Sequence, residues 1–326
     1  MISKKHLPGI LFTLTIGLVV FVLTYFFSFL NSIILGLLLG IFIGNIRAIN
    51  PKLDLGISLI GSKALEFSIL FLAFGINYNS MGKLGWKSFI LIAIVVFSMV
   101  LITVYLAKKM NCPSTVGWMV GFGTAICGSS AIAALAPSIQ NKNKEDVGVS
   151  MAVVNLYGTI GMLLFPLILA VFSFSTLQSS MLLGGTLHSV GNVVGAGFTM
   201  SSEIGEQALA IKLARISLLS PGLILFNYIT QRNTTKNWKQ HFQLPWYLWG
   251  FMAITVLVSV VDFPKIIIYT TSEIGKILLT LAMIAIGLRV SFSSLLKAGK
   301  RGLIFGLLLF IIQTAIVVLG IFILQI

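Results

Sequence analysis

The residues best suited to binding lie in a segment rich in glycine and small polar residues, about residues 115–139. Glycine frees backbone groups from helical pairing, and in a membrane such groups persist only where they line a protein cavity or bind a ligand. A helix beginning near Ser129 would present uncapped N–H groups and the positive end of its dipole, which suits an anion. The alternative is close helix packing through small residues. The candidate substrate-binding residues are Thr124, Cys127, Gly128, Ser129 and Ser130.

A second segment of similar composition, about residues 179–200, adds a histidine. His188 is the only histidine within an apolar stretch. It can carry a proton, donate to an anion, or serve as a satisfied structural donor. The candidate binding residues of this segment are Thr186, His188, Ser189 and Asn192.

The two segments resemble each other at an offset of 61 residues, from Gly123–Ala136 to Gly184–Gly197. They share glycine, small and aliphatic positions. A weaker similarity relates Leu72–Ile76 to Ile284–Leu288, and we expect those two spans to run in opposite directions. Inverted repeats with broken elements near the middle of the membrane are typical of secondary transporters.

Two cations lie within an apolar stretch, about residues 207–230. Lys212 and Arg215 are three residues apart and therefore share one helix face. Cations at membrane depth are costly unless they are paired or hydrated, so they normally face a pathway or a partner. The alternatives are that they snorkel to the interface or pair with Glu203 and Glu206.

Glu66 is the acid that we place inside the membrane, with Asn155 of a later span as a candidate neighbour. We expect Glu66 to pair with one of the two cations, the alternative being proton exchange. It forms, with Asn155 and His188, the candidate set for ion coupling.

Other classes of site have no support in the sequence. Cys112 and Cys127 have no neighbours at metal-ligand spacing. The sequence contains neither GxxxxGK[ST] nor HExxH. No acid lies near His188 in sequence to orient it for nucleophilic catalysis. We therefore expect no cofactor, no metal and no enzymatic activity.

The composition is that of a membrane protein. Of the 326 residues 57% are hydrophobic and 9% charged, and the mean hydropathy is +1.05, which excludes a soluble domain. The net charge of +14 would suggest nucleic acid in a soluble chain. Here the basic residues sit in short loops between apolar runs, where they meet anionic lipid headgroups. We expect membrane lipids as partners and no nucleic acid.

The apolar windows predict an all-α membrane protein with nine to eleven transmembrane segments in a single polytopic domain, residues 1–326. The two Gly-rich segments are either spans, broken helices or re-entrant hairpins. The first window is too long for a signal peptide and is read as a retained span. The windows are 8–28, 31–46, 56–76, 88–107, 147–172, 207–230, 245–263, 272–288 and 302–325.

Loop charges favour hairpins over crossing helices. With the N-terminus in the cytoplasm and both Gly-rich segments returning to the side that they enter, most loop Lys and Arg residues lie inside. Lys83, Lys87 and Lys265 then lie outside, as does the C-terminus. This arrangement predicts that the two segments enter from opposite faces of the cell membrane. Broken helices that cross remain the alternative.

The stretch Gly123–Pro137 resembles the YeiH family, also called UPF0324 and labelled as sulfate exporters. Four further stretches support the resemblance: Leu187–Val194, Lys212–Arg215, Leu218–Pro221 and Leu281–Leu288. These markers span most of the chain in family order. The resemblance implies an inner-membrane secondary transporter, broadly like sodium/proton antiporters and bile-acid symporters. It implies export of a small anion, sulfate or a related sulfur or organic anion.

The sequence departs from that family pattern at three positions. Ser189 stands where an acid commonly follows the histidine, Asn192 where glutamine is common, and Ala125 where serine is common. The loss of the acid argues against proton or cation coupling through this motif.

The leading hypothesis is a secondary transporter whose two Gly-rich segments meet near mid-membrane and bind a small anion through helix N-termini. Lys212 and Arg215 supply positive potential, and His188 is the candidate proton carrier. The rivals are a channel and a non-transporting sensor. The coupling ion, H+ or Na+, and assembly as a homodimer stay open.

Overall fold

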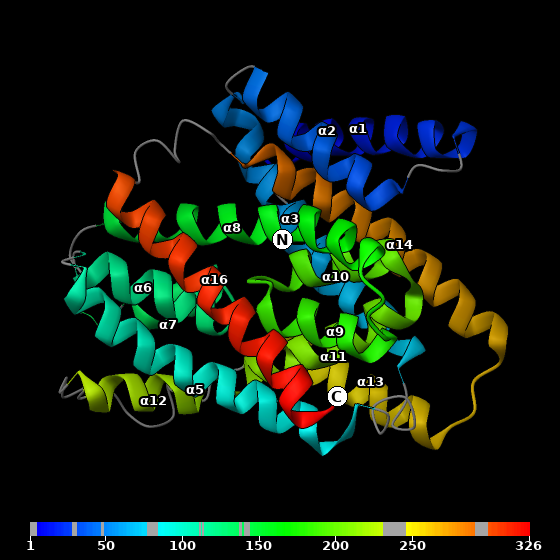
Figure 1. Ribbon diagram of the computed structural model, residues 1–326. Coiled ribbons are helices and arrows are strands. Elements are labelled where there is room, and N and C mark those ends of the chain that lie inside the picture. Colours follow the sequence, from blue (N-terminus) through cyan, green and yellow to red (C-terminus); the bar gives the residue numbers. More distant parts are fainter. Residues whose placement is uncertain are drawn as a thin grey trace. The chain divides into compact units, whose positions relative to one another are not determined.

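A computed structural model of the chain describes residues 5–27, 31–46, 49–76, 84–110, 112, 114–136, 139, 144–230, 246–290 and 299–326. Within these ranges every regular element is a helix (Figure 1). The helices form two compact units. Unit 1 comprises Met1–Met81 with Pro245–Phe292, and unit 2 comprises Gly82–Leu244 with Ser293–Ile326.

Unit 1 holds helices from the start of the chain together with α13 and α14. Its elements are α1 (Leu7–Phe26), α2 (Ser32–Ile46), α3 (Pro51–Leu72), η1 (Ala73–Gly75), α13 (Trp246–Val260) and α14 (Lys265–Leu288). Unit 2 contains both Gly-rich segments. Its elements are α5 (Gly85–Lys109), α6 (Ser114–Ala125), α7 (Ser129–Leu135), α8 (Lys144–Val171), α9 (Thr176–Thr186), α10 (Val190–Met200), α11 (Ser202–Ser217), α12 (Leu219–Ile229) and α16 (Gly299–Leu324).

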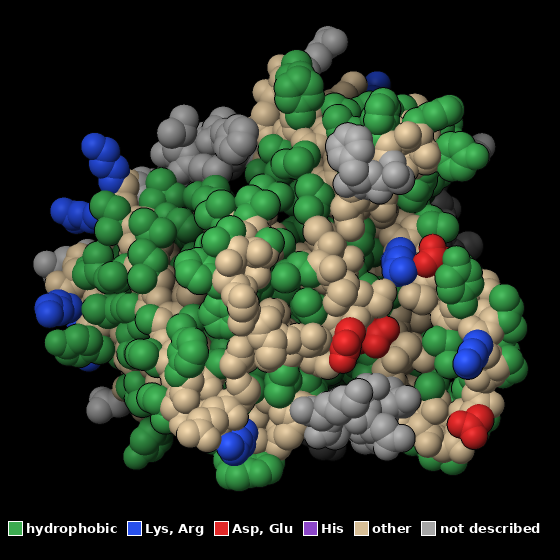
Figure 2. All heavy atoms as spheres, turned by 45° about the vertical axis from the view of Figure 1, so that its right-hand side comes forward, with side chains coloured by type: hydrophobic (Ala, Val, Ile, Leu, Met, Phe, Trp, Pro, Cys, Tyr) green, Lys and Arg blue, Asp and Glu red, His purple; other side chains and the backbone are tan. Residues whose placement is uncertain are grey.

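The helices confirm an all-α membrane protein. In the described part of the chain, six helices are long and apolar enough to cross a membrane. The helices α11 and α12, which are bent by 41° relative to each other, would form a seventh span if they are counted together. The predicted windows 31–46 and 245–263 correspond to α2 and α13, each of 15 residues. At about 1.5 Å per residue these reach about 22 Å, less than the hydrocarbon core of about 30 Å. Hydrophobic side chains cover much of the face in Figure 2, where charged ones are few.

Glycine lets the helices of unit 1 approach backbone to backbone. A Cβ added to Gly40 of α2 would lie 2.5 Å from the carbonyl oxygen of Ile284 in α14. A Cβ at Gly287 of α14 would lie 2.5 Å from Leu37 O. These small-residue faces drive helix association in lipid, where apolar burial does not.

We expect Gly40→Ala to destabilise the protein, because its methyl group would overlap the α14 backbone, which cannot rotate away as a side chain can. Overpacking of this kind costs about 2 kcal/mol. The unfolding midpoint of the purified protein should fall by about 4 °C. Gly148→Ala in α8 is the matched control, since no atom lies within 4 Å of its added Cβ. Equal midpoints for the two variants would contradict the packing argument.

The helices α3 and α14 are antiparallel. Gly61 of α3 faces Ala285 of α14, whereas Leu72, further along α3, contacts Gly275, which lies earlier in α14. The direction expected from the Leu72–Ile76 and Ile284–Leu288 similarity is therefore confirmed.

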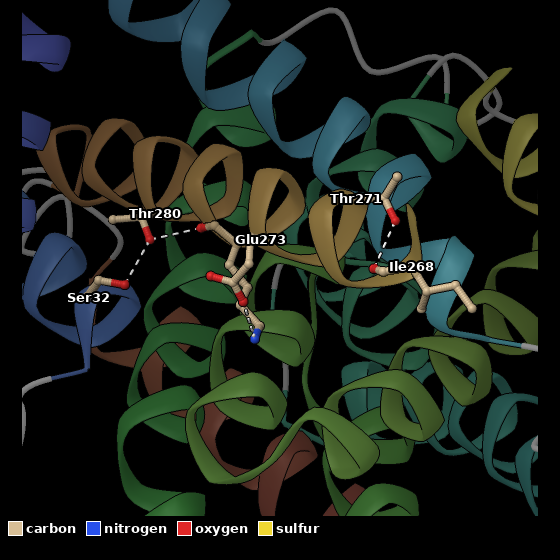
Figure 3. A network of polar contacts seen from close by, with 6 residues as sticks. Ser32, Ile268, Thr271, Glu273 and Thr280 are labelled. Carbon is tan, nitrogen blue, oxygen red and sulfur yellow. Dashed lines mark hydrogen bonds and ion pairs between the residues drawn. The ribbon is translucent and has the colours of Figure 1, made fainter. Parts of the chain in front are cut away.

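Several polar side chains of α14 bond within the helix or to α2 (Figure 3). Thr280 Oγ1 donates to Lys276 O at 2.9 Å and lies 3.2 Å from Ser32 Oγ of α2. Lys276 Nζ pairs with Glu273 Oε1 at 3.0 Å. Thr271 Oγ1 donates to Ile268 O.

In unit 2, α5 and α16 form an antiparallel pair that can be followed in Figure 1. Lys87 Nζ, near the start of α5, donates to Leu324 O at the end of α16 at 2.8 Å. Gln178 Nε2, near the start of α9, donates to Ile326 O at 2.9 Å. The starts of α5 and α9 therefore share one end of unit 2 with the C-terminus.

Candidate functional site: two broken helices around a pair of cations

Both Gly-rich segments are broken helices, and they break at equivalent positions. The helix α6 ends at Ala125 and α7 begins at Ser129. The helix α9 ends at Thr186 and α10 begins at Val190. Each of these boundaries differs from its counterpart by the 61-residue offset of the sequence repeat. The repeat inferred from the sequence is therefore also a repeat of structure.

A glycine allows the helix to break between α6 and α7 and allows this break to lie close to the break between α9 and α10. Gly128 has φ 72° and ψ −132°, a backbone conformation that residues with a Cβ rarely adopt. Its N–H donates to Gly123 O at 2.8 Å. A Cβ at Gly128 would lie 3.5 Å from the backbone of His188, so the two breaks pass close together.

Each segment starts beside the start of the helix that follows it. Thr115 Oγ1 at the start of α6 donates to Asp146 Oδ2 at the start of α8 at 3.0 Å. Ser180 Oγ in the second turn of α9 lies 3.3 Å from Ile204 O at the start of α11. These contacts support hairpins that return to the end of unit 2 that they enter. The helix α8 joins the two segments in the chain and runs from one end of unit 2 to the other. The two segments therefore enter unit 2 from opposite ends.

Lys212 of α11 lies between the two breaks. Its Nζ donates to Ile126 O in the first break and to Leu187 O in the second, both at 2.8 Å. Its side chain is fully buried. This burial excludes the alternative that Lys212 snorkels to the interface.

Arg215, also fully buried, lies one turn further along α11. Its Nη1 donates to Gly185 O at 2.9 Å and to Leu187 O at 3.1 Å. Its Nε donates to Ala125 O at 2.8 Å, and its Nη2 donates to Thr124 O. The guanidinium thus caps the C-terminal ends of both α6 and α9, a favourable place for a cation.

The charges at this junction do not cancel. Two helix C-termini supply about −0.5 of an elementary charge each, against two full positive charges. The N-termini of α7 and α10 add about +0.5 each beside the same breaks. In the described part of the chain, no carboxylate bonds to Lys212 or Arg215. The centre of unit 2 is therefore electropositive.

His188 lies in the second break and joins it to the first. Its Nε2 is 3.2 Å from Thr124 Oγ1, and its ring packs on Phe310 of α16 at 5.2 Å. Its Nδ1 is buried and has no hydrogen-bond partner within the described structure. One turn from Phe310, Gln313 donates from Nε2 to Gly185 O at 2.7 Å, and its Oε1 is likewise buried without a partner. Sequence reasoning missed Gln313, although it is an amide in the apolar window 302–325.

A polar surface lies at the start of α7. Ser129 Oγ donates to Asn155 Oδ1 of α8 at 2.9 Å. Ser129 is half-buried, whereas Ser130 and Asn155 are exposed. The buried Cys127 thiol lies against the Ala131 N–H in the first turn of α7.

The start of α10 also lies against α8. Ser189, half-buried, caps α10 by accepting the Asn192 N–H at 3.1 Å. Asn192 itself is buried with its amide against Gly158, three residues after Asn155 on α8. One turn of α8 thus contacts the starts of both short helices. Thr186 differs from the other candidates, since its hydroxyl donates within α9 to Leu182 O.

Glu66 lies in unit 1 and has a different partner from the one expected. Its Oε2 accepts from Lys63 Nζ at 2.6 Å and from Trp246 Nε1 at 2.8 Å. The prediction that it pairs with Lys212 or Arg215 is wrong, because a lysine one helical turn away on α3 satisfies it. Asn155 bonds to Ser129 instead. Among the described residues, no cluster of His, Cys, Asp or Glu could hold a metal ion.

Comparison with known proteins places the chain in a family. The family described as Conserved hypothetical protein 698 matches residues 8–306. A UPF0324 membrane protein of Lactiplantibacillus plantarum is 33% identical over 93% of each chain. The UPF0324 membrane protein YdhF of Lactococcus lactis is 33% identical over 95% of this chain and 96% of its own.

Among solved structures, the sodium proton antiporter MjNhaP1 from Methanocaldococcus jannaschii is similar over 94% of this chain and 98% of that chain. The identity is 16% and the TM-score 0.29. The family match and the relatives confirm the resemblance inferred from the sequence. The chain belongs to the conserved hypothetical protein 698 family, represented by these UPF0324 membrane proteins.

Proposed function

We propose that the protein is a secondary transporter of a small anion, with sulfate, related sulfur anions and organic anions as the candidate substrates. The observation that carries this proposal is the electropositive junction of the two broken helices. Lys212 and Arg215 are fully buried there, and among the residues that the structure describes no carboxylate bonds to either side chain. A dry site of one sign attracts mobile ions of the other sign.

The anion path in this proposal runs along the polar surface beside the junction. Ser130 and Asn155 are exposed, although both belong to apolar segments of the chain. Polar side chains at membrane depth are costly against lipid and normally face water or a partner. The first N–H groups of α10, other than that of Asn192, which bonds to Ser189, lie beside these side chains and suit an anion. Lys212 and Arg215 act through their potential, since carbonyl groups accept from two of the three ammonium N–H groups of Lys212 and from all three nitrogens of Arg215.

Flux in liposomes tests the proposal. We expect the purified protein to take up labelled sulfate or another small anion with a rate that saturates, and to show counterflow when the vesicles are preloaded with unlabelled anion. A channel would show neither a rate that saturates with anion concentration nor counterflow. Absence of flux for every inorganic and organic anion tested would reject the proposal and favour the non-transporting sensor.

We expect Ser130→Leu to weaken anion binding about tenfold, because an apolar side chain would cover the start of α7 and displace its water. Titration of the unfolding midpoint with a transported anion measures this effect. The matched control is Ser98→Leu on α5, whose hydroxyl donates to its own helix at Val95 O. Equal anion-induced stabilisation in both variants would show that the start of α7 serves only in packing.

Orientation in the cytoplasmic membrane is also open to test. We expect the N-terminus and Lys108 to face the cytoplasm and Ile326 to face outside, as the loop charges indicate. In a background without Cys112 and Cys127, an impermeant thiol reagent should label Ile326→Cys on intact cells, and Lys108→Cys only after permeabilisation. The reverse pattern would invert the topology. Lys142 and Arg232, whose loops we also expect inside, lie outside the described residues.

A further inference from the structure

The carbonyl groups at the two breaks form equivalent sets. Lys212 Nζ bonds Ile126 O and Leu187 O, which are related by the 61-residue offset of the repeat. Arg215 bonds Thr124 O and Gly185 O, which are related by the same offset. Each cation therefore bridges one position of the first repeat and the same position of the second.

Such carbonyl sets are cation ligands. Unwound backbone and the C-terminal ends of half-helices coordinate monovalent cations in membrane transporters, because their carbonyl oxygens lack helical partners and carry the negative end of the dipole. At the breaks of this protein, the ammonium of Lys212 takes two of these oxygens at 2.8 Å. An ammonium and a metal ion compete for such oxygens, since both are compact positive charges.

We propose that Lys212 and Arg215 are tethered cations that fill a carbonyl-lined cation site shared by the two breaks. The chain thus supplies covalently the charge that a bound Na+ would supply. Na+ then has no place between Ile126 O and Leu187 O, and coupling to Na+ does not use this site. Removal of the Lys212 ammonium should convert the position into a site for a free monovalent cation. This inference concerns ion occupancy and holds whether or not an anion is transported.

Thermal unfolding of purified Lys212→Ala tests the inference. In choline chloride, whose cation is too large for the vacated position, the midpoint should fall by about 5 to 10 °C, because two buried carbonyl groups lose their donor. NaCl or methylammonium chloride at the same ionic strength should recover at least half of this fall in a saturable way. The midpoint of the unsubstituted protein should be the same in all three salts.

Lys212→Met is the matched control, because it removes the charge but keeps the volume filled, and its midpoint should not respond to the choice of cation. Arg215→Ala, with methylguanidinium as the added cation, provides a second test of the same idea. A Lys212→Ala midpoint that is insensitive to Na+ and methylammonium would overturn the inference. So would failure to recover both alanine variants folded in any of these salts, since a free cation would then not replace a tethered one.

Discussion

Arg215→Gln should lower anion flux about 100-fold at equal amounts of reconstituted protein. The substitution removes one of two buried charges, so the net charge of the junction falls from about +1 to about zero before the helix N-termini are counted. It also removes donors from the carbonyl groups of both breaks, and hydrogen bonds from a charged donor are worth about 1.5 to 3 kcal/mol each. Flux of labelled anion into liposomes is the measurement.

Arg215→Lys separates charge from shape. It keeps the positive charge, but an ammonium cannot present the planar fork with which the guanidinium reaches Thr124 O, Ala125 O and Gly185 O together. We expect a loss of flux of about tenfold, between the unsubstituted protein and Arg215→Gln. Arg289→Gln is the matched control, because Arg289 is 53% exposed, pairs with Asp54 at 3.6 Å and donates to Ser58 Oγ at 3.4 Å, and exposed contacts of this kind are weak. Unchanged flux in both Arg215 variants would leave the helix N-termini as the only anion receptor.

The breaks themselves could be predicted from the sequence. The Gly-rich composition and the 61-residue similarity indicated two equivalent interrupted segments, and α6 and α9 end at equivalent residues. Backbone conformations that only glycine adopts leave a local signal, as at Gly128. The positive-inside pattern, another local signal, favoured the hairpins that the contacts support.

The partners of the buried cations could not be predicted in the same way. Sequence spacing placed Lys212 and Arg215 on one face, but their acceptors include main-chain carbonyls 25 and 90 residues away, and every residue type carries such a group. Reasoning from side chains therefore searched for a carboxylate and chose Glu66. The partner of Glu66 is Lys63, which lies three residues earlier on the same helix.

Gly128→Val should lower anion flux about 30-fold, because it disturbs the backbone conformation of the break between α6 and α7 without changing any charge. A β-branched residue at φ 72° and ψ −132° adds strain of about 2 kcal/mol, which lowers the equilibrium ratio of native to altered break about 30-fold. The chain has little freedom to relax, since the Gly128 N–H bonds Gly123 O and its Cα faces His188.

Gly85→Val is the matched control. Gly85 also has positive φ, at 66°, but it opens α5 with no atom within 4 Å of an added Cβ. A loss of flux in Gly85→Val as large as that in Gly128→Val would mean that positive φ alone, and not the geometry of the break, governs transport.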